Sequence, residues 1–304
     1  MRIPEIEIPV VQIPVPGTVK LFMKREDLIH PEISGNKFWK LFYNISQYQP
    51  QHRENPLLIT FGGAYSNHIA AVSALGRLAG IPALGIIRGE ELEYRWFHNP
   101  TLQYAHENEM KFRFVTRAEY RDKETLTLLL QEQFPEALII PEGGTNEAAV
   151  QGVQHMLNEQ TKRFDYLCTA VGTGGTVAGL AKFAAAGQRV IGYKTVADQS
   201  LERKVQSLAG TDRFELIDAT FGGYGKISDE IIRFINDFDE EYGILMDPVY
   251  TGKMMAIIFK QIESGYFPDG SSVLAFHTGG LQGIEGANEL LRKQKRQEIK
   301  VVKS

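Results

Sequence analysis

Short apolar runs alternate with amphipathic runs along almost the whole chain. The short runs are apolar at nearly every position, which predicts strands of a sheet that is buried on both faces. They lie at 57–61, 83–87, 112–115, 137–140, 166–171, 190–196, 214–217 and 273–276. The amphipathic runs predict helices at 69–78, 123–133, 147–160, 177–185, 228–241, 253–263 and 284–292. This alternation predicts an α/β fold with open parallel sheets covered by helices.

The composition limits the classes of function. Hydrophobic residues make up 43% of the 304 residues and charged residues 23%, and the net charge is -4. These values fit a globular protein of one large or two ordinary domains, with no strong attraction for nucleic acid or an anionic membrane. The histidines and acids lack metal-ligand spacing, so we expect no metal site.

The cysteine usage and the N-terminal residues bear on location. The single cysteine, Cys168, cannot form an internal disulfide, which fits a reducing compartment. The first residues lack the basic, apolar character of a signal peptide, and no apolar run approaches the ~18 residues of a membrane span. We therefore expect a cytoplasmic protein.

Three glycine clusters follow predicted strands directly. They are Gly62-Gly63, which leads into Ser66-Asn67-His68, the turn Gly172–Thr176, and His277-Thr278-Gly279-Gly280. In open α/β sheets, ligands bind beyond the carboxyl ends of the strands. We expect the three turns to converge on one site.

The second cluster is the best candidate for binding an anion. Gly172, Gly174 and Gly175 let backbone N–H groups turn inward, and the hydroxyls of Thr173 and Thr176 add donors. The helix that follows would point its positive end at a phosphate. No Gly-Lys-Ser/Thr follows, and the spacing does not fit a dinucleotide fingerprint. The alternative is a tight strand–helix turn without a ligand.

Lys37 is a candidate for covalent chemistry. It follows Ser34-Gly35-Asn36 and leads into an apolar, helix-like stretch, so its amine would be held at the start of a helix. An amine in a fixed position can form a Schiff base with an aldehyde cofactor. The alternative is a surface lysine. Ser66-Asn67-His68 does not fit the hydrolase elbow Gly-x-Ser-x-Gly, and the alternative there is a local helix cap.

These pieces, in this order, resemble the fold type II pyridoxal-phosphate enzymes, whose fold is that of the tryptophan synthase β chain. The most similar group is 1-aminocyclopropane-1-carboxylate deaminase and D-cysteine desulfhydrase. The matching segments are Lys24-Arg25-Glu26-Asp27-Leu28, Ser34-Gly35-Asn36-Lys37, Ser66-Asn67-His68, Gly172-Thr173-Gly174-Gly175-Thr176, Asp247-Pro248-Val249-Tyr250-Thr251-Gly252-Lys253 and His277-Thr278-Gly279-Gly280. The resemblance implies a large domain of residues 1–46 and 146–304, a small domain of residues 47–145, a cofactor in the cleft between them, and a homodimer.

The resemblance also implies roles for particular residues. Lys37 would hold pyridoxal 5'-phosphate through a Schiff base and act as general base. The turn from Gly172 through Thr173, Gly174 and Gly175 to Thr176 would bind the phosphate, helped by Lys40. Asn67 would contact the phenolate oxygen of the ring, and Thr278 the pyridine nitrogen. Ser66 would lie over the substrate, which Tyr224 and Tyr250 would flank as acid, base or stacking groups.

The chain departs from the family pattern at a few positions. Tyr65 replaces the usual glutamine before Ser-Asn-His, Ala70-Ala71 replaces an Arg-Gln pair, and Trp39 replaces a basic residue. Tyr65 fills space beside Ser66, which indicates a different substrate preference.

Thr251 bears on the reaction. The deaminase branch has a glutamate here and the desulfhydrase branch a threonine; a carboxylate would keep the pyridine ring protonated and make it a stronger electron sink. The hydroxyl favours β-elimination of a small amino acid to a 2-oxo acid and ammonia, as in D-cysteine desulfhydrase. The alternatives are 1-aminocyclopropane-1-carboxylate deaminase, an amino-acid racemase, and a non-catalytic nucleotide-binding module.

Overall fold

The larger of two sheets gathers strands from both ends of the chain. The computed structural model describes residues 7–48, 53–223 and 225–301. Neighbouring strands of the sheet are parallel except at the edge, where β1 pairs antiparallel with β2. In spatial order they are β1 Val10–Ile13, β2 Lys20–Lys24, β10 Ser272–Phe276, β7 Tyr166–Val171, β8 Arg189–Lys194 and β9 Phe214–Asp218.

The smaller sheet is formed by one continuous stretch of the chain. Its strands, all parallel, are in spatial order β5 Lys111–Val115, β4 Ala83–Arg88, β3 Leu58–Gly62 and β6 Leu138–Ile140. Each predicted strand is present, so the predicted α/β class with two open sheets is confirmed. The pattern did not predict β1 and β2, because their polar residues and the nearby prolines interrupt the apolar runs by which strands were predicted.

Helices cover both sheets. They are α1 Asn36–Tyr48, α2 Asn67–Ala79, α3 Pro100–Glu107, α4 Arg117–Arg121, α5 Lys123–Gln133, α6 Glu147–Val153, α7 Gly175–Phe183, α8 Leu201–Ala209, α9 Asp229–Tyr242, α10 Thr251–Glu263 and α11 Gly283–Lys293. The predicted helix at 147–160 is wrong in its second half. There α6 gives way to two 3₁₀ turns, Gln154–Met156 and Glu159–Arg163, and Asn158 caps the second through its side chain. No helix in the described part of the chain could cross a membrane.

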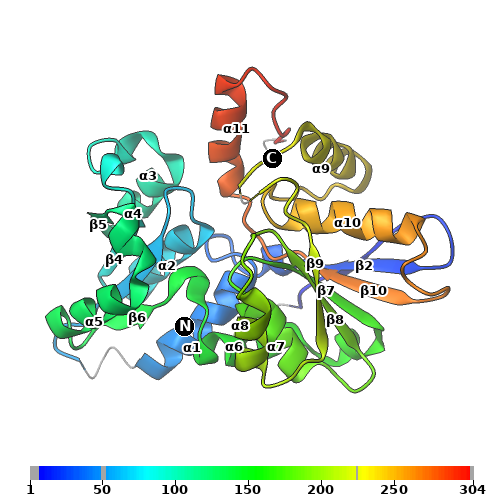
Figure 1. Cartoon of the computed structure of the whole chain (residues 1–304), viewed down its shortest axis with the longest axis horizontal. Helices are drawn as coiled ribbons and strands as arrows, with labels where there is room; N and C mark the ends of the chain where they lie inside the picture. Colours follow the sequence, from blue (N-terminus) through cyan, green and yellow to red (C-terminus); the bar gives the residue numbers. More distant parts are fainter. Residues whose placement is uncertain (1–6, 49–52, 224, 302–304) are drawn as a thin grey trace.

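The two sheets form two layered units that share a core (Figure 1). The four-stranded sheet and helices α2 to α5 form the small unit, at the left, and the six-stranded sheet lies at the right. Helices α1 and α6 lie at the base between the units, and α11 stands between them at the top. One apolar cluster runs through α1, α6 and α7 and reaches both sheets. The exact boundaries of the small domain, residues 47–145, stay a prediction.

Helices α1 and α6 pack at very short range. A Cβ added to Gly152 of α6 would lie 2.0 Å from the carbonyl oxygen of Trp39 in α1. Trp39 is buried, and its indole N–H donates to Glu26 Oε2 at 2.8 Å. Trp39, which departs from the family pattern, is therefore a core residue. It fixes α1 and with it the positions of Lys37 and Lys40.

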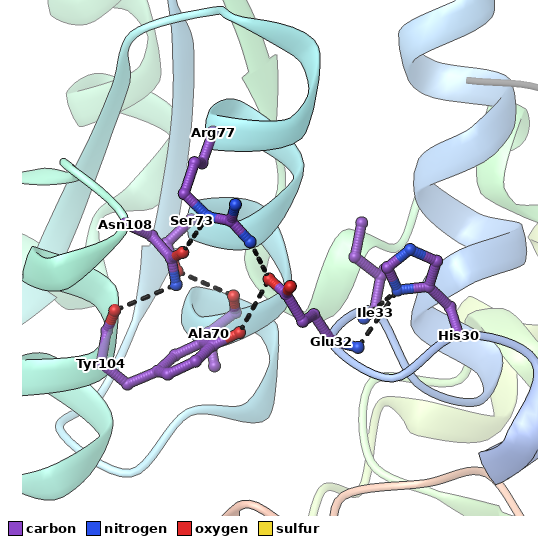
Figure 2. Close-up of polar contacts among 8 residues, drawn as sticks. All are labelled: His30, Glu32, Ile33, Ala70, Ser73, Arg77, Tyr104 and Asn108. Atoms are coloured by element: carbon purple, nitrogen blue, oxygen red, sulfur yellow. Dashed lines mark hydrogen bonds and ion pairs between the residues drawn. The ribbon is translucent and has the colours of Figure 1, made fainter.

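A polar network joins the loop before α1 to helices α2 and α3 (Figure 2). Glu32 of the loop forms an ion pair with Arg77 of α2 and accepts a hydrogen bond from the hydroxyl of Tyr104 in α3 at 3.4 Å. Arg77 also donates from Nε to Asn108 Oδ1 at 2.6 Å. On the loop side, His30 Nδ1 accepts the backbone N–H of Glu32 at 3.1 Å. The loop that leads to α1 is therefore tied to the small unit.

Substitution of Gly152 tests the α1–α6 contact. We expect Gly152→Ala to lower the free energy of unfolding by about 1–3 kcal/mol, because the added methyl group forces two backbones apart. Urea denaturation measures this difference. Gln206→Ala, at an exposed helical position in α8, is the control and should change stability by less than about 0.5 kcal/mol. Equal stability of Gly152→Ala and the wild type would contradict the packing.

Candidate active site

Lys37 lies at the start of α1, as predicted, and is only partly exposed. Gly35 before it has a φ of +66°, and a Cβ there would lie 1.9 Å from the carbonyl oxygen of Thr278. Only glycine permits this approach. Lys37 Nζ donates to Asn36 Oδ1 at 3.0 Å, and Asn36 Nδ2 donates to Thr176 Oγ1 at 2.8 Å. The amine is thus linked to both the second and the third glycine turn.

Burial changes the charge state of the two lysines of α1. Removal from water lowers the pKa of Lys37 from 10.5 to about 8, and the carboxylate of Asp247 opposes that change. Burial also holds the pKa of Lys40 well below its usual range, and the charge of Lys37 adds to the effect. Because the folded pKa of Lys37 is depressed, its charge opposes folding below pH 8, and this penalty disappears as the pH rises toward 10.5.

The turn after β7 has the form of an anion cradle. Gly174 precedes α7 with a φ of +90°, and no side chain caps the first N–H groups of this helix. Lys40 Nζ would lie 3.0 Å from a Cβ at Gly175 and donates to Thr145 Oγ1 at 3.1 Å. The hydroxyl of Thr145 lies 2.5 Å from that of Thr173. A cation, hydroxyls and free N–H groups therefore face one place.

Ser66, Asn67 and His68 have three different environments. Ser66 is the N-cap of α2, and its Oγ accepts the N–H of Ile69 at 3.3 Å, so the cap alternative is correct for this residue. Asn67 lies against the third turn, because a Cβ at Gly280 would come within 2.7 Å of its Nδ2. His68 is buried, with Nε2 2.8 Å from Thr60 Oγ1. Burial lowers the pKa of His68 well below its usual range, which keeps it neutral.

The segment before α10, which belongs to the large unit, lies beside the second glycine turn. Asp247 is buried and accepts the backbone N–H groups of Val249, Tyr250 and Thr251 at 2.7 to 2.9 Å. The ring of Tyr250 lies against the second turn, 3.0 Å from a Cβ placed at Gly172. Tyr224 lies outside the described residues.

The three glycine clusters converge around the loop before Lys37. Gly280 of the third cluster meets Asn67 of the first, while Gly35 meets Thr278 of the third and Asn36 meets Thr176 of the second. Sequence reasoning missed two participants, Asp247 and Thr145. Asp247 stands in a segment of the family resemblance to which no role was given, and Thr145 follows the glycines Gly143 and Gly144 after β6.

Two buried polar atoms of the segments that form the site have no hydrogen-bond partner within the described ranges. They are Asn67 Oδ1 and Thr251 Oγ1. Buried polar groups are nearly always paired, so unpaired ones in these segments indicate a place for a polar ligand. The arrangement can hold an anionic group at one end and present an amine at the other.

Comparison with known proteins agrees with this geometry. A family model described as pyridoxal-phosphate dependent enzyme matches residues 3–279. A Pyrococcus furiosus protein, named provisionally as 1-aminocyclopropane-1-carboxylate deaminase, is 30% identical over 293 residues, with 86% of this chain and 85% of that one covered. The bifunctional mitochondrial D-cysteine desulfhydrase/1-aminocyclopropane-1-carboxylate deaminase of Arabidopsis thaliana is 26% identical over 302 residues, covering 89% and 74%. The solved structure of an ACC deaminase homologue has a TM-score of 0.78 at 26% identity and covers 95% of this chain and 94% of that one.

The depressed pKa of Lys37 predicts unusual reactivity in the cofactor-free protein. We expect acetylation of Lys37 to increase up to about pH 8 and then level off, because the amine is already neutral above that pH. Mass spectrometry of peptides after brief acetylation at a series of pH values measures this. Exposed Lys293 is the internal reference. Parallel curves for the two lysines would show that Lys37 is not desolvated.

Proposed function

The chain belongs to the family of pyridoxal-phosphate dependent enzymes, and we propose that it converts a small amino acid to a 2-oxo acid and ammonia by β-elimination. The observation that carries the proposal is the buried amine of Lys37, with a pKa of about 8, joined through Asn36 to the glycine turn after β7. The names of the relatives support this class, since they include both a desulfhydrase and deaminases.

The residues present fit the cofactor. The glycine cradle and Lys40 suit its phosphate, and the unpaired atoms of Asn67 and Thr251 suit polar atoms of its ring. When bound, pyridoxal phosphate supplies an aldehyde that condenses with amines and a ring that takes up electrons from the α-carbon. We assign the phosphate to Gly172–Thr176 and Lys40, and the ring to Asn67, Thr278 and Thr251.

Lys37 would serve as the base at the substrate α-carbon. A general base works best with a pKa near the working pH, and burial brings Lys37 to about 8. Removal of the amine from water is what keeps its neutral form accessible. Lys37 Nζ would take the α-proton, and the bond to the β-substituent would then break.

Ser66 would orient the substrate. Its Oγ uses a lone pair to cap α2, so its own proton remains available to a substrate carboxylate at the positive end of the helix. Tyr250, against Gly172, would give a proton to the departing group. The role of Tyr224 as a second flanking residue rests on the family resemblance alone.

Thr251 supports elimination over ring opening. Its hydroxyl is buried at the start of α10 and carries no charge. The carboxylate of this segment belongs to Asp247, which already accepts hydrogen bonds from three backbone N–H groups. A neutral donor leaves the cofactor ring a weaker electron sink than a carboxylate would, and elimination of a good leaving group tolerates a weaker sink.

A homodimer and a cytoplasmic location are further parts of the proposal.

Removal of the amine tests the central assignment. We expect Lys37→Ala to lose the visible absorbance of the covalently held cofactor and at least about a thousandfold in turnover, because both the covalent anchor and the base are gone. Lys182→Ala, at an exposed position of α7, should keep both. A Lys37→Ala protein that keeps the absorbance and turns over substrate would reject the assignment.

A substrate panel separates the candidate reactions. We expect kcat/KM for D-cysteine to exceed that for 1-aminocyclopropane-1-carboxylate by at least about tenfold, measured as release of 2-oxo acid and ammonia. Faster release from the cyclopropane would favour the deaminase. Interconversion of enantiomers without 2-oxo acid would favour a racemase. Purified protein that binds a nucleotide but no pyridoxal phosphate would reject the enzyme altogether.

A further inference from the structure

A row of glycines lies where the small unit meets α11. Gly280, Gly283 and Gly286 are spaced by three residues, so they continue along one side of the chain from the third turn into the helix. A Cβ at Gly283 would lie 3.1 Å from Asn67 Oδ1. At Gly286 it would lie 2.5 Å from Cδ1 of Tyr65 and 2.7 Å from Cε1. The segment Tyr65–Asn67 therefore rests on this row.

Gly286 accommodates the ring of Tyr65. Glycine is among the poorest residues for a helix interior, so its presence in the middle of α11 needs a reason. The two carbons of Tyr65 occupy the space that any other side chain would fill. The ring is thereby fixed between two elements, the turn before α2 and the face of α11.

Helix α11 covers only part of the Tyr65 ring. Tyr65 is 43% exposed, although its edge is in contact with α11. It directly precedes Ser66, the residue assigned above to the substrate carboxylate. Pro100, at the start of α3, also approaches Gly286, with Cγ 3.7 Å from the same Cβ position. In Figure 1, α11 stands between the small unit and α9.

We propose that Tyr65 is a specificity-determining residue that limits the size of the substrate β-substituent, and that Gly286 fixes its ring in that position. The proposal rests on the proposed function and names its substrate class, amino acids with a compact leaving group. A ring held rigidly next to the carboxylate site excludes long or aromatic β-substituents by steric overlap, while a substituent of one or two heavy atoms passes.

Two thioethers test the limit. S-methylcysteine and S-benzylcysteine each react with one water to give the same 2-oxo acid, ammonia and a thiol, so they differ mainly in bulk. We expect Tyr65→Ala to raise kcat/KM for S-benzylcysteine relative to S-methylcysteine at least tenfold. Tyr65→Phe is the matched control and should leave this ratio within about twofold, because the ring is kept. An unchanged ratio in Tyr65→Ala, with wild-type activity on S-methylcysteine, overturns the proposal.

The partner of the ring has its own test, which does not depend on turnover. Gly286→Ala forces the ring off α11, so we expect a lower thermal midpoint. Tyr65→Ala/Gly286→Ala should recover the midpoint of Tyr65→Ala, because no ring remains to clash. Equal midpoints for Gly286→Ala and the wild type overturn the packing. Failure of the wild type to release 2-oxo acid from either thioether or from any other small amino acid rejects the proposed function, and the size limit with it.

Discussion

The contact between Gly35 and the carbonyl of Thr278 governs the arrangement of the site. Two backbones meet there without an intervening side chain, so the loop before Lys37 and the turn after β10 cannot be placed independently. Neighbouring contacts strengthen the junction, since Gly35 N donates to the carbonyl of Glu26 and Ser34 Oγ donates to that of Asp27. Any shift of one segment moves the amine relative to the other turns.

Electrostatics favours an anionic ligand beside the two lysines of α1. Burial lowers the pKa of both Lys37 and Lys40, and the charge of Lys37 lowers the pKa of Lys40 further. A phosphate carries up to about two negative charges, so its binding would restore the protonated form of Lys40. Asp247 balances part of the charge of Lys37, and His68 stays neutral, so neither competes with the ligand. Lys37 and Lys40 therefore favour the binding of an anion and do not stabilise the fold by themselves.

Local patterns were sufficient to predict strands β3 to β10 and the glycine turns, because burial on both faces selects apolar residues and positive φ angles select glycine. They were not sufficient for β1 and β2. They could not predict that Trp39 is buried against Glu26, or that Asp247 reaches the region of Lys37, because both depend on packing between distant segments. For Ser66, the sequence predicted two alternatives and the structure decides one of them. The sequence allowed a cap or a functional hydroxyl, and the structure establishes the cap while leaving the hydroxyl proton free for the proposed function.

The pairing of β2 with β10 has a consequence for biosynthesis. Lys20–Lys24, next to the edge strand of the larger sheet, pairs with Ser272–Phe276, which is synthesised after every other strand of the described residues. The small unit, by contrast, can assemble from one continuous stretch soon after it leaves the ribosome. Closing so long a segment is slow and entropically unfavourable. The nascent chain would therefore pass through a state in which the small unit is folded and the larger sheet still lacks β10. A chain that stops short of β10 would lack the turn of Thr278 and Gly280, against which Gly35 and Asn67 pack, however well its small unit folds.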